Sequence, residues 1–253
     1  MKLIGVVHLK SLPGSPSNTL KLDEIISKAQ EDYNTLKNGG IFGVVFENFG
    51  DTPFVKDDIT KRTLVSFTTV LNNIELSKEL IHGINVLRND GIAALSIAEA
   101  TDADFVRINV LNNTMFTDQG IIEGKANEIM SFKNTLHKKI NIYADVFVKH
   151  ATPAPGSTIE NHAEELLDRA GADKIILTGS GTGKEINFDE LKLISKIATP
   201  DRLVIGSGLN ENNVDKIKNY ANFSIVGTSL KKEHKVENEV DLNNVKNLVE
   251  KAK

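Results

Sequence analysis

The sequence predicts an α/β fold in which a single domain, residues 1–253, forms a (βα)8 TIM barrel. Short apolar runs rich in β-branched residues alternate with segments of helical period along the chain, as in repeated βα units around a parallel sheet. The length of 253 residues matches the roughly 250 residues that one such barrel takes. No Gly/Ser-rich linker, charge block or low-complexity tract marks off a second domain.

Eight apolar runs are the expected barrel strands. Most of them are near-continuous in apolar residues, which is typical of strands that are covered on both faces. In chain order they are residues 3–7, 42–46, 83–87, 104–110, 140–147, 174–178, 203–206 and 223–226.

Between the runs, apolar residues recur at spacings of three and four, the pattern of helices that cover a sheet. The clearest stripes are Leu22, Ile25, Ile26, Ala29, Tyr33 and Leu36; Ala163, Leu166, Leu167 and Ala170; and Val240, Leu242, Val245, Leu248 and Val249. A further helix is expected to open at Asp118-Gln119-Gly120, with Thr117 as its cap. Longer loops at residues 13–16 and 152–156 leave carboxyl ends of strands, where barrel active sites are built.

Composition excludes several classes of function. A net charge of −4 without a basic stripe gives no reason to expect nucleic acid as a partner. The absence of Cys excludes disulfides and thiolate chemistry and leaves His and carboxylates as metal ligands. No apolar run approaches the 18 residues or so of a transmembrane helix, and the start is too short for a signal peptide. We therefore expect a cytoplasmic protein, and self-association into a homo-oligomer stays open.

Three apolar runs, residues 174–183, 202–208 and 223–229, end in glycine and small hydroxyl residues. Such turns let backbone N–H groups approach an anion closely, and the last two fall where strands seven and eight of a barrel often bind phosphate. The ordinary alternative is that tight βα turns use glycine without binding anything. The candidate phosphate-binding residues are Gly179, Gly181, Gly206, Ser207, Gly208, Gly227, Thr228 and Ser229.

Charged side chains lie at the carboxyl ends of several expected strands, a set formed by His8, Glu47, Arg88, Arg107 and Asp145. These ends meet at one mouth of a barrel, although each residue alone could be a solvated turn residue or a structural ion. If the fifth strand runs far enough, Asp145 and Lys149 share a face, either as a base with an electrostatic stabiliser or as a structural salt bridge. His150 is then expected to face the other way, toward the loop.

The polar residues divide into two groups of candidates. The catalytic candidates are Asp145, Glu47, Lys149 and His8. The substrate-binding candidates are Asn85, Arg88, Arg107, Asn109, Asp118 and Thr178. His8, Glu47 and Asp145 could also hold a divalent metal, but no HxH or HExxH spacing supports a metal set and none is assigned. The absence of a Walker motif, a first-unit GxGxxG and a GxSxG elbow gives no reason to expect an organic cofactor or a nucleophilic serine.

Short motifs spread over the full length occur in the order of one known family. They are residues 5–9, 12–16, 47–48, 50–51, 53–54, 83–90, 118–120, 123–124, 144–146, 148–151, 178–183, 206–208 and 227–231. Together they resemble the BtpA/SgcQ family. The resemblance implies a barrel of the ribulose-phosphate-binding type, with a role in stabilising a membrane reaction-centre complex for photosynthetic members and sugar-utilisation contexts for others. The chain departs from the family pattern at Lys10-Ser11 and at Glu239, where proline is usual, which affects loop shape more than chemistry.

Two functions follow as hypotheses. The first is an enzyme of lyase, isomerase or hydrolase type that acts on a small phosphorylated sugar or ribosyl compound by acid/base chemistry at the barrel mouth. The second is a non-catalytic biogenesis or stability factor for a membrane protein complex, whose barrel binds a partner.

Overall fold

Eight parallel strands close into a barrel in the computed structural model, which describes residues 1–179, 181 and 186–253. Each lies within or overlaps one of the eight expected runs, so the predicted fold class is confirmed. In chain order they are β1 (Lys2–His8), β2 (Gly43–Glu47), β3 (Ile81–Asn85), β4 (Phe105–Ile108), β7 (Asn141–Asp145), β9 (Lys174–Leu177), β10 (Leu203–Ile205) and β11 (Phe223–Val226). Around the barrel the order is β1-β11-β10-β9-β7-β4-β3-β2, so the first and last strands pair and close the ring.

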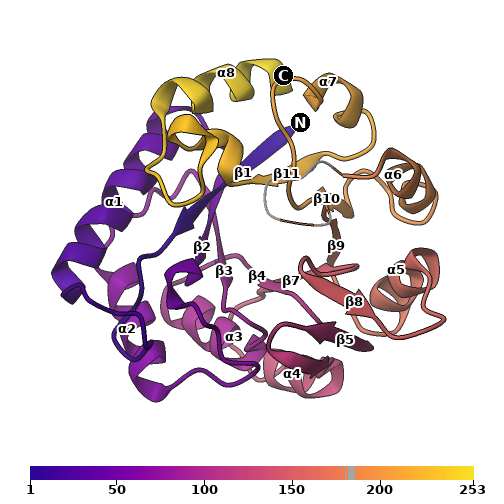
Figure 1. The fold of residues 1–253 in the computed structure, drawn as a ribbon, viewed down its shortest axis with the longest axis horizontal. Helices are drawn as coiled ribbons and strands as arrows, with labels where there is room; N and C mark the ends of the chain where they lie inside the picture. Colours follow the sequence, from indigo (N-terminus) through magenta and orange to yellow (C-terminus); the bar gives the residue numbers. More distant parts are fainter. Residues whose placement is uncertain (180, 182–185) are drawn as a thin grey trace.

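One α-helix follows each barrel strand, which makes eight over the described residues. Figure 1 shows them as a ring outside the strands, with the two chain ends near each other. They are α1 (Leu22–Asn38), α2 (Lys61–Asn72), α3 (Gly91–Ala100), α4 (Ala126–Lys133), α5 (Ile159–Asp168), α6 (Phe188–Ile194), α7 (Val214–Ile217) and α8 (Leu242–Ala252). The described residues also contain three short 3-10 helices, which are η1 (Phe49–Asp51), η2 (Thr228–Leu230) and η3 (Lys232–His234). None of the helices described has both the length and the apolar content that a membrane span requires.

Most residues of the expected apolar stripes are buried, although Leu242 is 37% exposed. In α1 the buried residues are Ile25, Ala29, Tyr33 and Leu36, spaced by three or four as predicted from the sequence. Caps then fix where several helices begin, because a side-chain oxygen satisfies an N–H group that the first turn leaves without a partner. Asp241, for example, accepts hydrogen bonds from Asn243 N and Asn244 N at the start of α8.

Apolar side chains fill the inside of the barrel. They form a cluster separate from the larger core between barrel and helices, made of Ile4, Val6, Val45, Phe105, Tyr143, Ile176, Val204 and Ile225. The Phe105 and Tyr143 rings stack with their centroids 4.3 Å apart. Because this filling is a packed core, space for a ligand inside the barrel is left only at the mouth where the strands end.

Gly83 on β3 is the position where this interior is tightest. A Cβ atom there would lie 2.1 Å from the Phe105 ring, which is fully buried and stacked on Tyr143. We expect Gly83→Ala to destabilise the protein by about 1–3 kcal/mol through overpacking. In urea unfolding, the same change made in a Phe105→Leu background should cost less, because the atoms that clash are then gone. Equal costs in the two backgrounds would show that the ring is not the obstacle.

The segment after β4 differs from the prediction. The helix expected to open at residue 118 is wrong: β5 (Thr114–Thr117) and β6 (Gly120–Glu123) form an antiparallel hairpin, and β8 (Ala151–Pro153) pairs with β5 in a three-stranded sheet. Gly120 has a φ of 100°, which suits a tight hairpin turn. Met115 and Ile122 are buried while their neighbours Phe116 and Ile121 are exposed. This alternation is the two-residue period of a strand, and α4 begins only at Ala126.

Candidate active site

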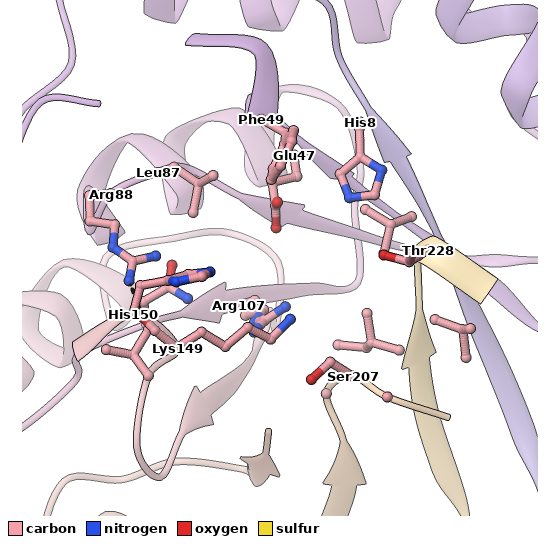
Figure 2. Close-up of a pocket in the computed structure, with 18 of the residues that line it drawn as sticks. His8, Glu47, Phe49, Leu87, Arg88, Arg107, Lys149, His150, Ser207 and Thr228 are labelled. Atoms are coloured by element: carbon pink, nitrogen blue, oxygen red, sulfur yellow. Dashed lines mark hydrogen bonds between the residues drawn. The ribbon is translucent and has the colours of Figure 1, made fainter. Parts of the chain in front are cut away.

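A cavity of about 320 Å³ opens at the carboxyl ends of the barrel strands. Thirteen of the residues predicted from the sequence line it, and Figure 2 shows several of them pointing into the shared space. They are His8, Glu47, Arg88, Arg107, Asn109, Asp118, Lys149, Gly206, Ser207, Gly208, Gly227, Thr228 and Ser229. The remaining predicted residues, which do not line the cavity, are Asn85, Asp145, Thr178, Gly179 and Gly181. The strand ends therefore bring together most of the candidate site.

Arg107 is held in place by a buried ion pair beneath the cavity. Its Nε and Nη2 atoms donate to the two carboxylate oxygens of Asp145, each over 3.0 Å. Asn109 Nδ2 donates to Asp145 Oδ2 over 2.9 Å, so Arg107 and Asn109 share a face as predicted from their spacing. Asn85, which is buried and pairs in register with Arg107, donates from Nδ2 to Asn109 Oδ1 over 3.2 Å. The two hydrogen bonds from Arg107 to Asp145 fix the plane of the Arg107 guanidinium group.

Lys149 does not pair with Asp145, so the structural salt bridge between these two residues, one of the two alternatives from the sequence, is wrong. Within the described residues, no carboxylate oxygen lies within 4.0 Å of Lys149 Nζ. The Lys149 side chain is half-buried and forms part of the cavity wall. Burial, together with the charge of Arg107, lowers the pKa of Lys149 to about 8, although Glu47 and Asp145 act in the opposite direction.

Two hydrogen bonds anchor the backbone around Lys149. Arg88 donates from Nη2 to the carbonyl oxygen of Lys149, and Thr178 donates from Oγ1 to the carbonyl oxygen of Phe147 over 3.0 Å. The expectation that His150 faces away from the site is wrong, because His150 lines the cavity. Strand β7 ends at Asp145, and the alternation of faces on which that expectation depended ends with it.

Glu47 presents a buried carboxylate to the cavity. Its side chain is only 8% exposed and forms no hydrogen bond or ion pair with any residue that the structure describes. Burial raises its pKa above the usual 4.5, while the charges of Arg107 and Lys149 partly oppose the rise. A buried carboxyl group with a raised pKa holds its proton more readily than an exposed one, which suits a general acid or base.

His8 stands beside Glu47 as a neutral imidazole. Burial, with the charges of Lys231 and Lys149, lowers its pKa well below the usual 6.5. Its Nδ1 atom is buried without a hydrogen-bond partner, and its ring meets that of Phe49 edge-on with centroids 4.9 Å apart. A Cβ atom at Gly227 would lie 2.9 Å from His8 Cε1, so the glycine makes room for the ring. His8 lines the cavity, so its imidazole forms part of the surface that a ligand would meet.

The turns after β10 and β11 carry the phosphate-binding candidates. Within the described ranges, the backbone N–H groups of Gly208, Thr228 and Ser229 donate a hydrogen bond to no acceptor. Gly208 adopts a φ of 75°, a conformation that favours glycine. The Ser229 hydroxyl is already committed, since it donates to Leu209 O over 2.6 Å. These turns therefore offer backbone N–H donors to the cavity.

The remaining glycines have structural roles in the described residues. Gly206 N donates to Leu177 O over 2.8 Å and so continues the sheet. Gly179 N donates to Ser207 Oγ over 3.1 Å and joins the turn after β9 to the turn after β10. Of the predicted glycine turn at residues 178–183, Ser180, Thr182 and Gly183 lie outside the described residues.

Comparison with known proteins gives the family. The model of the BtpA family matches residues 1–253. The chain belongs to the BtpA family. It is 37% identical over 239 residues to the photosystem I biogenesis protein BtpA of Synechocystis. The aligned region covers 94% of this chain and 83% of that relative. An uncharacterized protein of Pyrococcus horikoshii is 42% identical over 251 residues, 99% of this chain and 95% of that protein. The resemblance predicted from the motifs is confirmed.

Solved structures similar to this BtpA-family chain share its barrel. The N-(5'-phosphoribosyl)anthranilate isomerase of Pyrococcus furiosus aligns with a TM-score of 0.57 at 14% identity and covers 100% of this chain and 98% of that one. The thiamine phosphate pyrophosphorylase of the same organism aligns with a TM-score of 0.58 at 14% identity, over 99% and 95%. At these identities the likeness shows the fold alone.

A metal centre gains no support in this BtpA-family protein. In the part of the chain that the structure describes, no group of three or more His, Asp or Glu side chains is arranged to hold a metal ion. The alternative set of His8, Glu47 and Asp145 fails because Asp145 is turned into its pair with Arg107.

Sequence reasoning missed the apolar wall of the site. Phe49, Phe54, Leu87 and Val148 line the cavity, and each follows a strand-end polar residue by one to a few positions or belongs to the same loop. Apolar residues are usually core, so their type gave no signal. Their place just beyond the strand ends was the signal that could have identified them.

Proposed function

We propose that this protein is an enzyme of lyase, isomerase or hydrolase type that acts on a phosphorylated sugar or ribosyl compound by acid/base chemistry. The observation that carries the proposal is that the Glu47 carboxylate faces the same cavity as the donor-bearing turns at Gly208 and Thr228. One end of a substrate would be held by its phosphate while the other end meets a proton-exchanging group.

The charges in the cavity suit an anionic substrate. Arg88, Arg107 and Lys149 line it, and of these cations Arg107 has its charge balanced by Asp145. Backbone N–H groups at Gly208, Thr228 and Ser229 add partial positive charge on the opposite side. Two solved structures with the same fold are named for phosphoribosyl or thiamine phosphate compounds, which supports the proposal by analogy of fold.

The proposal assigns roles to the catalytic candidates. Glu47 transfers protons, and neutral His8 orients the reacting group through a hydrogen bond. Arg107 and Lys149 stabilise negative charge that develops during the reaction. Asp145 was a candidate for the acid or base, but its two-point pairing supports a positioning role, in which it holds Arg107 against the cavity.

The Thr228 hydroxyl offers a direct test of phosphate binding. It lines the cavity and has no hydrogen-bond partner among the residues described, so Thr228→Val removes a donor without breaking a protein contact. We expect inorganic phosphate to bind about tenfold more weakly, as for a lost hydrogen bond to a charged group. Calorimetric titration measures this. Thr69→Val on the outer helix α2 is the control, and equal affinities in the two variants would contradict the assignment.

The second candidate function is that of a non-catalytic factor in the biogenesis of a membrane protein complex. The name of the Synechocystis relative supports it. A thermal-shift screen of phosphorylated metabolites separates the two candidates, because only a ligand that binds the folded state raises the melting temperature. Selective stabilisation by one class of sugar phosphate supports the enzyme. No response, together with co-purification of a protein partner, supports the factor.

A further inference from the structure

Lys149 carries an amine whose charge no carboxylate of the described residues balances. It lies four residues beyond the end of β7, and hydrogen bonds from Arg88 and Thr178 hold the backbone on which it stands. Its side chain lines the cavity, and no described carboxylate comes within ion-pair distance of Nζ. If Lys149 served only as one half of a structural ion pair, a carboxylate of the protein would lie within ion-pair distance of its Nζ atom.

Burial, followed by the neighbouring cation Arg107, lowers the pKa of this amine. The ion pair with Asp145 balances the charge of Arg107 and fixes its position. Figure 2 shows the Lys149 side chain beside Arg107, below the Glu47 carboxylate. A fall in the pKa of Lys149 from 10.5 to about 8 raises the neutral fraction at pH 7 by about 300-fold. A neutral amine is a nucleophile, and desolvation beside another cation is a known way to activate one.

We propose that Lys149 Nζ forms an imine with the carbonyl carbon of a phosphorylated aldehyde or ketone. This inference rests on the proposed function but gives Lys149 a nucleophilic role in place of the charge-stabilising role stated there. It narrows the substrate class from phosphorylated sugars in general to those that present an open-chain carbonyl. The phosphate would lie at the turns that contain Gly208 and Thr228, across the cavity from the amine.

The step balances with the groups that face the cavity. The Nζ lone pair attacks the carbonyl carbon, the C–N bond forms, and the electrons of the C=O π bond move to oxygen, which takes a proton from the Glu47 carboxyl group. The nitrogen then gives a proton to the Glu47 carboxylate. A second proton transfer from Glu47 lets the oxygen leave as water, and the nitrogen lone pair closes the C=N bond. Burial raises the pKa of Glu47, which favours the protonated form that this sequence needs.

Reductive trapping of the full chain tests the proposal. The probe is glycolaldehyde phosphate with sodium cyanoborohydride, followed by intact mass measurement and peptide mapping. We expect one adduct, on Lys149, whose rate of formation rises with pH through about 8, because only the neutral amine attacks. Lys149→Arg should lose the adduct while keeping the charge, and Lys139→Arg, at an exposed site, should keep it. Thermal unfolding of both variants verifies that they fold.

The outcomes separate this inference from the proposed function. Labelling spread evenly over exposed lysines, or undiminished in folded Lys149→Arg, overturns the imine. If calorimetry shows that inorganic phosphate binds and Lys149 is not labelled, the imine is overturned while the phosphate site stands. Glycolaldehyde and glycolaldehyde phosphate could label Lys149 selectively and at the same rate, while inorganic phosphate does not bind. That result supports the imine and overturns the phosphate site.

Discussion

Glu47→Gln is expected to lower kcat by about 10²–10⁴-fold for the metabolite that the thermal-shift screen selects, because it removes the proposed proton-transfer group. At neutral pH the same change is expected to raise the stability of the folded protein. The native cavity holds a largely buried carboxylate that accepts no hydrogen bond from the described residues, whereas a neutral amide costs less to bury. A loss of activity joined to a gain in stability is typical of active-site residues.

The direction of the pH dependence follows from the raised pKa of Glu47. The folded protein binds a proton at this site more tightly than the unfolded chain, so the stability that Glu47 contributes is fully present below its usual pKa of 4.5 and is lost as the pH rises through the folded value. The stability advantage of Glu47→Gln should therefore appear at pH 7 and shrink toward pH 4 in thermal unfolding. Glu164→Gln, on the exposed side of α5, is the control. An active or less stable Glu47→Gln protein at pH 7 would contradict the role.

Asp145→Asn is expected to destabilise the protein by about 3–5 kcal/mol, since it leaves the buried Arg107 guanidinium without its counter-charge. Urea unfolding measures the loss. The double change Arg107→Met with Asp145→Leu should recover most of the stability, because replacing both members of a buried pair by apolar groups is often nearly neutral. It should not recover activity.

This pair of results distinguishes a positioning role of Asp145 from a purely structural one. If Asp145 acts through Arg107, the refolded double variant has a lowered kcat although its stability is close to normal. An Asp145→Asn protein as stable as the wild type would show that the Arg107 charge is not desolvated, and a fully active double variant would show that the pair serves the fold alone.

The barrel was predictable from the sequence because each of its strands is buried on both faces. Such strands read as short apolar runs, and Ile175, Ile176 and Leu177 on β9 are an example. The hairpin of β5 and β6 was not predicted, since Asp118 and Gln119 fit a helix start as well as a hairpin turn. Only the alternating burial of Met115 and Phe116, which requires the three-dimensional structure, distinguishes the two.

The candidate site was predictable to the extent that position along a strand determines direction. Glu47 and Arg107 lie on barrel strands, and their place at the strand ends led to the mouth of the barrel. The pairing was not predicted, because spacing along one strand suggested only Lys149 as a partner of Asp145. The actual partner, Arg107, lies on the neighbouring strand β4. His150 lies beyond the end of β7, where backbone alternation carries no information about direction.

A crystal structure of the protein with inorganic phosphate shows directly whether the mouth of the barrel binds a phosphate group beside Glu47. We expect a tetrahedral anion within hydrogen-bond distance of the backbone N–H groups of Gly208 and Thr228, in the cavity that Glu47 faces. An anion bound at another surface, with this cavity holding only water at saturating phosphate, would contradict it.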